Sequence, residues 1–346
     1  MCGIVGFTGR REASPILMAG LRRLEYRGYD SAGMITGTGN ELHLRKKSGR
    51  LAELAKVVAA HPAPGCYGIS HTRWATHGGA TDRNAHPHLD ATGNIAVVHN
   101  GVIENFSLLK HQLQSQGVKF RSDTDTEVIA HLIGHYYHGD LAGAVRQALS
   151  LLKGTYGIAV MSKQEPGVIV GARLGSPLVI GVGADGTYLA SDANALAGYA
   201  DKVVYLNDRQ ICTLSGEDWD VRDQDMSVVT ASVHDIAQYL GDGDAELGNY
   251  PHFMLKEIYE QPDTVANAMR GRLADADASA HFGGLNLTAQ QLRQIDRIII
   301  TGCGTSYHAG LVGEYLFEEL ARLPVEVEYA SEFRYRNPPI DRNTVV

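Results

Sequence analysis

The chain has 346 residues, a formal net charge of −8 at pH 7 and four widely scattered cysteines. This acidic balance disfavours nucleic acid or an anionic membrane as the main partner, and no apolar run approaches the roughly 18 residues that span a bilayer. We therefore expect a cytoplasmic protein of about two domains, without a signal peptide, a disulfide framework, a metal site or a cofactor.

The first six residues place Cys2 directly after the initiator methionine. A side chain this small allows the methionine to be removed, which would leave Cys2 with both a thiol and an α-amino group. An α-amine, with a reference pKa of about 7.7–8.0, is a better local base for the thiol than a lysine. Position alone favours a structural role, in which Cys2 opens a buried strand at 4–7. Residues further along the chain must decide between a structural and a catalytic role for Cys2.

The next segment predicts a helix followed by short strands. Ser14 is placed to cap the helix, Pro15 fits its first position, and Gly28 is expected to end it. The pattern then predicts strands at 34–36 and 42–44, a solvated basic turn at 45–47 and a second helix at 51–60.

The strand predicted at 67–73 ends in Arg73, and a glycine-rich loop follows. A guanidinium at a strand end suits two-point capture of a carboxylate. The alternative is a surface arginine beside a packed Trp74, and Arg73 by itself does not decide between them.

His86 and His88 stand two positions apart in the following loop. Such a pair suggests a metal only when further ligands accompany it, and no carboxylate or cysteine stands at ligand spacing. We expect histidines that pack or position the loop.

A polar pair stands where the buried strand predicted at 95–98 is expected to end. Asn100 and Gly101 would offer a side-chain amide and a backbone N–H, which is the donor pair that an oxyanion hole requires. An Asn-Gly turn is the common alternative, although the residues that follow do not form a clear hairpin.

Helices are predicted at 105–116 and 128–137. Capping accounts for most of the acidic and hydroxyl residues before the second helix, and Asp125 remains as a candidate to bind an ammonium group. With Arg73 on a carboxylate and the oxyanion donors near Cys2, these residues would form a site for glutamine amide hydrolysis through a thioester.

Six motifs resemble the class II glutamine amidotransferase domain, whose nucleophile is N-terminal. They are Cys-Gly-Ile-Val-Gly, Tyr-Arg-Gly-Tyr-Asp-Ser-Ala-Gly, His-Thr-Arg-Trp-Ala-Thr-His-Gly, Asn-Ala-His-Pro-His, His-Asn-Gly and Thr-Asp-Thr-Glu. The resemblance covers residues 2–218 and implies an α/β (α+β) fold of four layers, α/β/β/α, with two stacked antiparallel sheets. The later pattern agrees, with strands at 157–161, 168–170 and 178–180 and a hairpin of 203–206 with 211–214.

The same resemblance implies roles for further residues. Arg27 would lie near the nucleophile, and Trp74 would lie on a mobile loop that closes over glutamine. The other pocket residues that it implies are Thr76, His77 and His86.

The C-terminal part resembles a second family. Residues 219–248 are rich in Asp, Ser and Gly and predict a linker. The following segment, a helix expected to stop near Pro262 and then resume, resembles the interdomain segment of the glucosamine-6-phosphate synthase family. A buried strand at 297–300 and the turn after it resemble that family's sugar isomerase (SIS) domain, a doubly wound parallel α/β fold.

The turn at 302–306 places small and hydroxyl residues between a strand and a helix, which suits a phosphate. A nicotinamide site is disfavoured, because Tyr307 replaces the third glycine of the dinucleotide fingerprint. On the resemblance, Thr305 and Ser306 would contact the phosphate of a sugar, and a tight turn without a ligand is the alternative.

The resemblance implies an isomerising aminotransferase (EC 2.6.1.16) that hydrolyses L-glutamine and passes ammonia to fructose-6-phosphate, giving glucosamine-6-phosphate. The full-length family is expected to form homodimers. The sequence stops at Val346 within an isomerase domain predicted at 249–346, so we expect glutaminase activity at most. Two other hypotheses stay open: another class II amidotransferase, against which the C-terminal half argues, and a non-catalytic sugar-phosphate-binding protein.

Overall fold

The structure is a computed structural model that describes residues 2–75, 77–236, 248–269, 273–274, 279–280 and 288–346. The chain divides into two compact units, Met1–Phe253 and Met254–Val346, and each is described by itself. Within the described ranges, no helix combines the length and the apolar composition needed to span a bilayer.

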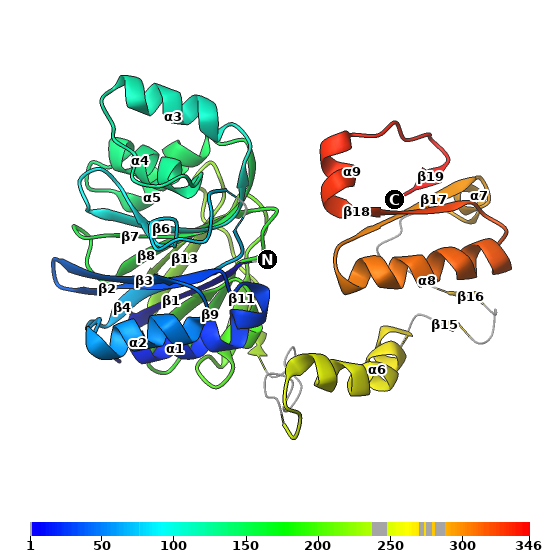
Figure 1. The fold of residues 1–346 in the computed structure, drawn as a ribbon, viewed down its shortest axis with the longest axis horizontal. Coiled ribbons are helices and arrows are strands. Elements are labelled where there is room, and N and C mark those ends of the chain that lie inside the picture. The colour runs from blue at the N-terminus through cyan, green and yellow to red at the C-terminus, as the bar shows by residue number, and fades with distance from the viewer. Residues whose placement is uncertain (1, 76, 237–247, 270–272, 275–278, 281–287) are drawn as a thin grey trace. The chain divides into compact units, whose positions relative to one another are not determined.

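The first unit stacks two antiparallel sheets (Figure 1). The larger sheet has eight strands in the order β14-β11-β9-β10-β1-β4-β2-β3. These strands are β1 (Gly3–Gly9), β2 (Ser31–Thr38), β3 (Glu41–Ser48), β4 (Tyr67–Arg73), β9 (Val179–Gly183), β10 (Gly186–Ala190), β11 (Lys202–Tyr205) and β14 (His234–Asp235). The N-terminal strand β1 therefore lies inside the sheet, between β10 and β4.

The second sheet of this unit has six strands in the order β13-β12-β8-β7-β6-β5. These strands are β5 (His88–Leu89), β6 (Ile95–Ile103), β7 (Gly154–Ser162), β8 (Val168–Leu174), β12 (Ile211–Ser215) and β13 (Asp218–Arg222). The pair β6–β7 is registered along its whole length, from Ile95↔Ser162 to Ile103↔Gly154.

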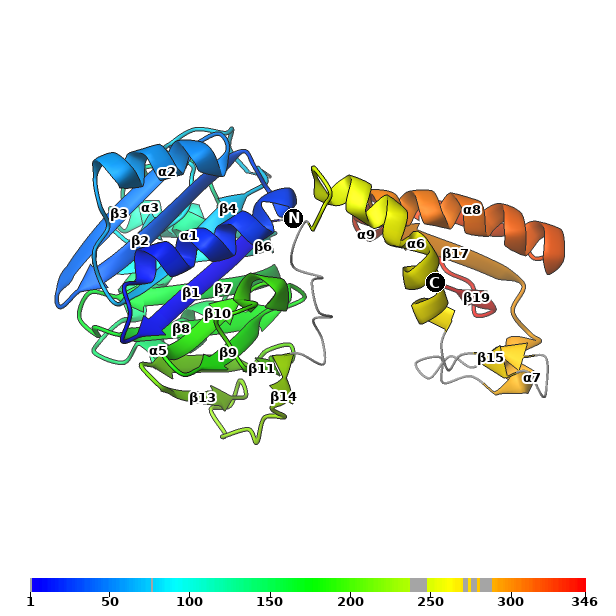
Figure 2. The same cartoon turned by 90° about the horizontal axis from the view of Figure 1, so that it is seen from below.

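Helices cover the outer faces of both sheets and complete four layers (Figures 1 and 2). The eight-stranded sheet packs against α1 (Ala13–Leu24) and α2 (Leu51–Ala60), and the other sheet against α3 (Phe106–Ser115), α4 (Thr126–Tyr136) and α5 (Leu141–Leu149). Between the sheets lies a third apolar cluster, which includes Ile4, Ile69 and Val98. The α/β/β/α fold expected from the sequence is confirmed.

The start and end of α1 differ from the prediction. The N-cap position is Glu12, and Ser14 lies inside the helix with its hydroxyl 3.5 Å from the sulfur of Met34. The helix ends at Leu24, and a 3₁₀ turn (Glu25–Arg27) leads to Gly28 in an extended conformation. A Cβ at Gly28 would lie 2.7 Å from the carbonyl carbon of Arg73, so close backbone approach requires the glycine here.

Three strand predictions are corrected by the register. The basic run at 45–47 lies within β3 and is no solvated turn, because it pairs with β2. β6 does not stop at residue 98, and Asn100 and Gly101 pair with β7. The predicted hairpin of 203–206 with 211–214 is wrong, because β11 pairs with β9 and β12 pairs with β8 in the other sheet.

The segment 219–248, predicted as a linker, contributes strands to both sheets. Most of β13 lies in it and pairs with β12, while β14 pairs with β11. Residues 237–247 lie outside the described part of the chain.

The second unit contains a parallel sheet of three strands in the order β18-β17-β19. Its strands are β17 (Arg297–Gly302), β18 (Val325–Tyr329) and β19 (Thr344–Val345), and α8 (Thr305–Leu320) and α9 (Ala330–Arg336) accompany them. This parallel α/β arrangement agrees with the one expected for this part of the chain. The other elements are β15 (Leu273–Ala274), β16 (Ser279–Ala280), α7 (Ala289–Leu292) and α6 (Phe253–Met269), which runs through Pro262 without the predicted stop.

Candidate active site around Cys2

Cys2 directly precedes β1 and is held against the end of β4. The register Gly3↔Thr72 brings Cys2 beside the segment that follows β4. The backbone N–H of Trp74 donates to Cys2 Sγ over 3.2 Å, and Sγ lies 3.5 Å from the carbonyl oxygen of the same residue. A Cβ at Gly3 would lie 2.7 Å from Thr72 Oγ1, so a glycine allows this approach.

The electrostatic surroundings of the thiol are mixed. Burial raises the pKa of Cys2 above its ordinary value, while the Trp74 N–H and the charge of Arg73 lower it and Asp125 raises it. A thiol with a raised pKa is protonated near neutral pH, so its activation needs a base. Arg73 and Asp125, the two charged residues predicted to bind an amino acid, thus both act on the pKa of the Cys2 thiol.

Arg73, at the end of β4, is only 3% exposed. Its guanidinium donates to the carbonyl oxygens of His77, of Gly78 over 3.0 Å and of Gly79 over 3.2 Å. Three of the five N–H groups of the guanidinium therefore hold the loop that follows the strand. Its capture of a substrate carboxylate stays a prediction.

The aromatic side chains of Trp74 and Tyr29 are exposed. Trp74 is 45% exposed and meets Tyr29 edge-on, with ring centroids 5.5 Å apart. The loop begins at a fixed point, because the N–H of Ala75 donates to Asp30 Oδ2 over 2.8 Å. Thr76, predicted to line the pocket, lies outside the described residues.

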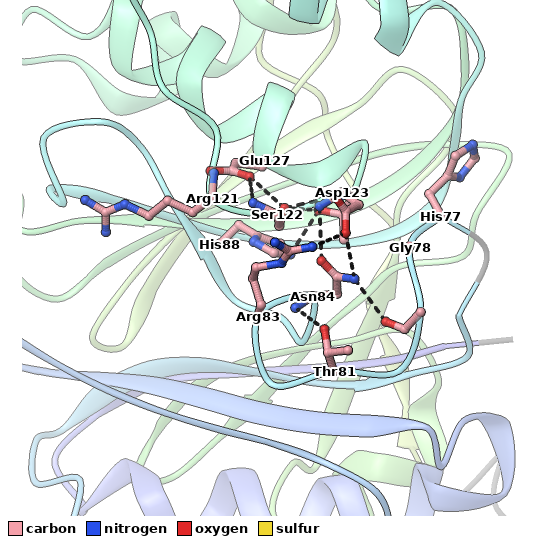
Figure 3. Close-up of polar contacts among 12 residues, drawn as sticks. His77, Gly78, Thr81, Arg83, Asn84, His88, Arg121, Ser122, Asp123 and Glu127 are labelled. Atoms are coloured by element: carbon pink, nitrogen blue, oxygen red, sulfur yellow. Dashed lines mark hydrogen bonds and ion pairs between the residues drawn. The ribbon is translucent and has the colours of Figure 1, made fainter.

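The His77 ring lies edge-on to Phe106, with centroids 4.9 Å apart. In Figure 3 its side chain points away from the polar cluster around Asn84. The carbonyl oxygen of His77, rather than its ring, is therefore what contacts Arg73.

Asn100 lies next to Cys2, and its role as an oxyanion donor stays a prediction. Its Nδ2 donates to the carbonyl oxygen of Cys2 over 3.1 Å, and its Oδ1 lies 3.0 Å from His71 Nε2. The neighbouring Gly101 has φ +134°, and a Cβ there would lie 2.1 Å from the carbonyl oxygen of Thr155. A glycine is therefore required where β6 passes the site.

Asp125 is 4% exposed and occupies the N-cap position of α4. Its Oδ2 accepts a hydrogen bond from the N–H of Ile103 over 2.9 Å and lies 3.9 Å from His99 Nδ1. A hydrogen bond therefore holds the Asp125 carboxylate at the end of β6. Its binding of an ammonium group stays a prediction.

A polar cluster joins the loop after Arg73 to the segment before Asp125 (Figure 3). Asn84 Nδ2 donates to the carbonyl oxygen of Gly79 over 3.1 Å, and Asn84 Oδ1 accepts from the N–H of Asp123 over 3.0 Å. One side chain thus links both segments that carry the charges predicted to bind an amino acid.

The carboxylate of Glu127 holds the turn before Asp125. It accepts from the N–H groups of Arg121 over 2.7 Å and Ser122 over 2.6 Å. Burial opposes its ionisation, but the His131 ring, whose Nε2 lies 3.5 Å from Glu127 Oε1, and hydrogen bonds from Ser122 lower the pKa of Glu127 to about 2. It is therefore ionised at neutral pH.

Buried histidines pack between the sheets behind Asn100. The rings of His71 and His86 stack with centroids 4.2 Å apart, and His88 meets His86 edge-on at 4.9 Å. Burial lowers the pKa of His71 and of His88 to about 3, and that of His86 well below its ordinary value. These rings are neutral at pH 7. For His86, predicted to bind substrate, 4% exposure favours a packing role.

No group of three or more His, Cys, Asp or Glu side chains is placed to hold a metal ion in the part of the chain that the structure describes.

Arg27, predicted near the nucleophile, is buried and donates to Asp192 Oδ2 over 2.8 Å. The adjacent Ser191 accepts the N–H of Ile4 on its hydroxyl over 3.0 Å. The Arg27–Asp192 ion pair therefore supports the residues that hold the start of β1.

In the second unit, Thr305 and Ser306 are exposed at the first turn of α8. The turn depends on Gly304, which has φ +59°. The arrangement is the one predicted for a sugar-phosphate contact, which stays a prediction.

His71, Asn84 and Asp30 are site residues that the sequence reasoning missed. A signal existed for His71, because side chains alternate along a strand. In β4, His71 falls on the same face as Ile69, which packs between the sheets, and as Arg73. A histidine on that face points to a polar partner in the opposite sheet.

Comparisons with known proteins identify two domains in the chain. A glutamine amidotransferase domain matches residues 58–234, and a SIS domain matches residues 291–346. Glutamine–fructose-6-phosphate aminotransferases (isomerizing) from Chlorobaculum tepidum and Symbiobacterium thermophilum are 49% and 48% identical over all of this chain. The chain spans 57% and 56% of the length of these two curated relatives.

Two solved structures share the fold. The allosteric regulatory enzyme of purine biosynthesis superposes with a TM-score of 0.58 at 31% identity, over 66% of this chain and 50% of that chain. A glutamine phosphoribosylpyrophosphate amidotransferase from B. subtilis gives 0.57 at 21% identity, over 98% and 71%. Since the first domain match covers just over half of the residues, the chain belongs to the glutamine amidotransferase domain family.

Proposed function

We propose that this chain hydrolyses the side-chain amide of glutamine, with Cys2 as the nucleophile after removal of Met1. The observation that carries the proposal is the convergence of two donors on Cys2. Trp74 N–H contacts Sγ at 3.2 Å, and Asn100 Nδ2 contacts the Cys2 carbonyl at 3.1 Å. Glutaminase chemistry needs a sulfur nucleophile and a donor beside it for a developing oxyanion.

The α-amine of Cys2 would accept the thiol proton, directly or through one water. Sγ would then attack the carboxamide carbon of glutamine and form a tetrahedral intermediate. Asn100 Nδ2 has two hydrogens, so one remains for the oxyanion while the other stays on the Cys2 carbonyl. The protonated α-amine of Cys2 then gives this proton to the nitrogen of the former carboxamide. The C–N bond breaks, ammonia departs, and a thioester remains on Sγ. Water hydrolyses this thioester to glutamate and restores the thiol.

Substrate recognition in this proposal uses two opposite charges. Arg73 would bind the α-carboxylate and Asp125 the α-ammonium group of glutamine. Both charges act on the Cys2 thiol in the structure, which supports their placement around one ligand. The α-carboxylate of glutamine would accept hydrogen bonds from the Arg73 N–H groups that the loop carbonyls do not use. Alternatively, it would take the place of one of those carbonyls as an acceptor.

The ammonia acceptor that we propose is fructose-6-phosphate, to which the names of the curated relatives point. The SIS match and the exposed hydroxyls of Thr305 and Ser306 at a helix N-terminus support a phosphate contact there. The competing class II amidotransferases are less well supported by this second unit.

The test of the glutaminase is labelling with an electrophilic glutamine analogue, followed by mass spectrometry. We expect one adduct on residue 2, with Met1 absent, and protection by glutamine. Absence of an adduct at Cys2, in a chain shown to be folded, would overturn the proposal. A matched form with a non-removable N-terminal extension keeps the thiol but loses the α-amine, so it should lose glutamine hydrolysis.

A further inference from the structure

His71 connects the two sheets next to the nucleophile. It lies on β4 in the eight-stranded sheet and is fully buried. Its Nε2 lies 3.1 Å from the carbonyl oxygen of His99 and 3.0 Å from the side-chain oxygen of Asn100, both on β6 in the other sheet. The ring therefore reaches across the interior to the residue that contacts Cys2.

The His99 carbonyl determines which ring nitrogen carries the hydrogen. A carbonyl oxygen only accepts, so His71 Nε2 has to be the donor. The Asn100 atom 3.0 Å from that donor then has to be the acceptor Oδ1, which leaves Nδ2 facing the Cys2 carbonyl oxygen at 3.1 Å. Because that second carbonyl also only accepts, the assignment is consistent at both ends.

The reversed amide would be disfavoured on both sides. Asn100 Oδ1 would face the Cys2 carbonyl oxygen, and Nδ2 would face the Nε2–H of His71. Each contact would pair like with like in a buried place, where an unmatched polar group costs about 1–3 kcal/mol. The amide therefore keeps its donor on the nucleophile side before substrate arrives.

The imidazole is held neutral. Burial lowers the pKa of His71 to about 3, and Asn100 Oδ1 opposes this while the charge of Arg73 adds to it. The stacked neighbour His86 is neutral as well. A neutral Nε2–H ring acts as a fixed donor and takes no proton from the reaction.

We propose that His71 is a positioning residue of the glutaminase site, whose Nε2–H holds the Asn100 amide with Nδ2 toward the developing oxyanion. The proposal deepens the glutaminase function proposed above and rests on it. His71 touches neither glutamine nor the sulfur in this role and acts through Asn100.

Two substitutions of His71 separate the role of Nε2 from that of the ring. A glutamine amide nitrogen can reach the position of Nε2, whereas the shorter amide of asparagine reaches about as far as Nδ1. We expect His71→Asn to lower kcat for glutamine hydrolysis about 10- to 100-fold, below the effect of removing an oxyanion donor altogether. KM should change less than about threefold, and His71→Gln should recover most of the loss.

Alkylation by iodoacetamide supplies a readout that a general structural defect would change. This displacement forms no oxyanion, so its rate at Cys2, followed by peptide mass spectrometry, should be equal in wild type and variants. The control is His43 on the edge strand β3, whose Nε2 lies 2.9 Å from Thr38 Oγ1. His43→Asn should leave kcat and KM unchanged.

The outcomes separate the two proposals. A folded wild type that does not hydrolyse glutamine overturns the proposed function. If the wild type is active, equal kcat values in His71→Asn and His71→Gln overturn the role of His71. An equal loss in the rates of Cys2 alkylation and of glutamine hydrolysis overturns it as well. If the asparagine variant does not fold, ¹⁵N NMR of the wild type decides: we expect a neutral ring protonated at Nε2, and a ring protonated at Nδ1 contradicts the proposal.

Discussion

The backbone N–H of Trp74 lies 3.2 Å from the sulfur of Cys2 and donates a hydrogen bond to it. This donor belongs to a peptide whose position depends on a distant glycine. A Cβ at Gly28 would lie 2.7 Å from the carbonyl carbon of Arg73 and 2.9 Å from the nitrogen of Trp74. The contact between Cys2 Sγ and the Trp74 N–H is therefore sensitive to Gly28, which is remote from Cys2 in the sequence.

Replacing Gly28 with alanine should move the Trp74 N–H away from the sulfur. A hydrogen bond to a charged group contributes about 1.5–3 kcal/mol, so we expect a loss of about 10- to 100-fold in kcat/KM for glutamine. The pH profile of Cys2 alkylation should also shift to higher pH. Gly313→Ala is the control, because its nearest contact would be an ordinary 3.5 Å. Equal kinetics in both variants would contradict the prediction.

Removal of the Asn100 amide should reduce the chemical step strongly. Asn100→Ala takes away the donor beside Cys2, and we expect kcat for glutamine hydrolysis to fall about 10²–10³-fold, with little change in KM. It also removes the hydrogen bond between His71 Nε2 and Asn100 Oδ1 while the His99 carbonyl remains an acceptor, so the free energy of unfolding should fall by about 0.5–1.5 kcal/mol. An unchanged kcat in steady-state assays would mean that the oxyanion lies elsewhere.

The charge of Asp125 should matter more for recognition than for folding. In Asp125→Asn an amide oxygen can still accept the N–H of Ile103, while the negative charge is lost. We expect KM for glutamine to rise about 10- to 100-fold, which corresponds to the loss of a charge-assisted contact of about 1.5–3 kcal/mol. The measurement is the ratio of kcat/KM for glutamine to that for 4-carbamoylbutanoate, which lacks the α-amine.

Asp123→Asn is the matched control for that experiment. The side chain of Asp123 is 54% exposed and pairs with Arg83. This variant should keep the preference for glutamine. If Asp125→Asn also keeps it, the ammonium group binds to some other residue.

The buried neutral histidines should make the first unit sensitive to acid. The pKa of His71 and of His88 is about 3 in the folded protein, and an unfolded histidine titrates near 6.5. The unfolded chain therefore binds more protons between these values, so the free energy of unfolding falls as pH decreases below 6.5. The expected slope is about 1.4 kcal/mol per pH unit for each such histidine.

Glu127 adds to the loss at lower pH, because its pKa of about 2 lies below the usual value of about 4.3. Urea titrations at pH 7, 6 and 5 measure the effect of the histidines by itself, because these pH values lie above the range in which Glu127 contributes. Tryptophan fluorescence reports on the first unit, which contains both Trp74 and Trp219. His88→Gln should reduce the slope by about the share of one histidine, and a free energy of unfolding independent of pH would contradict the account.

The sequence predicted the local elements of this site better than their partners. Apolar alternation located β4, and the motifs around Asn100 and Arg73 indicated two segments that the structure places around Cys2. What stayed hidden was that Asn100 lies within a continuous strand. A polar side chain inside a buried strand is stable here because His71 satisfies it from the other sheet, and no local pattern encodes a partner 29 positions away.

The crossing between sheets was hidden for a related reason. The turn after β11 resembles a hairpin turn, and Arg209 has the positive φ of 70° that such turns need. Its N–H, however, donates to the carbonyl oxygen of Arg173 at the end of β8 over 2.7 Å. The chain thus joins the six-stranded sheet. The sequence did not reveal this, because β8, the strand with which β12 pairs, lies far back in the sequence.

The inner position of β1 has a consequence for biosynthesis. Both of its neighbours are made later, β4 at Tyr67–Arg73 and β10 at Gly186–Ala190. At about 5–20 residues per second, a ribosome needs roughly 10–40 s to reach the second neighbour. On the proposed function, the terminal methionine therefore stays accessible to trimming enzymes over that interval, and Cys2 cannot meet Trp74 and Asn100 in their native positions until most of the first unit has been translated.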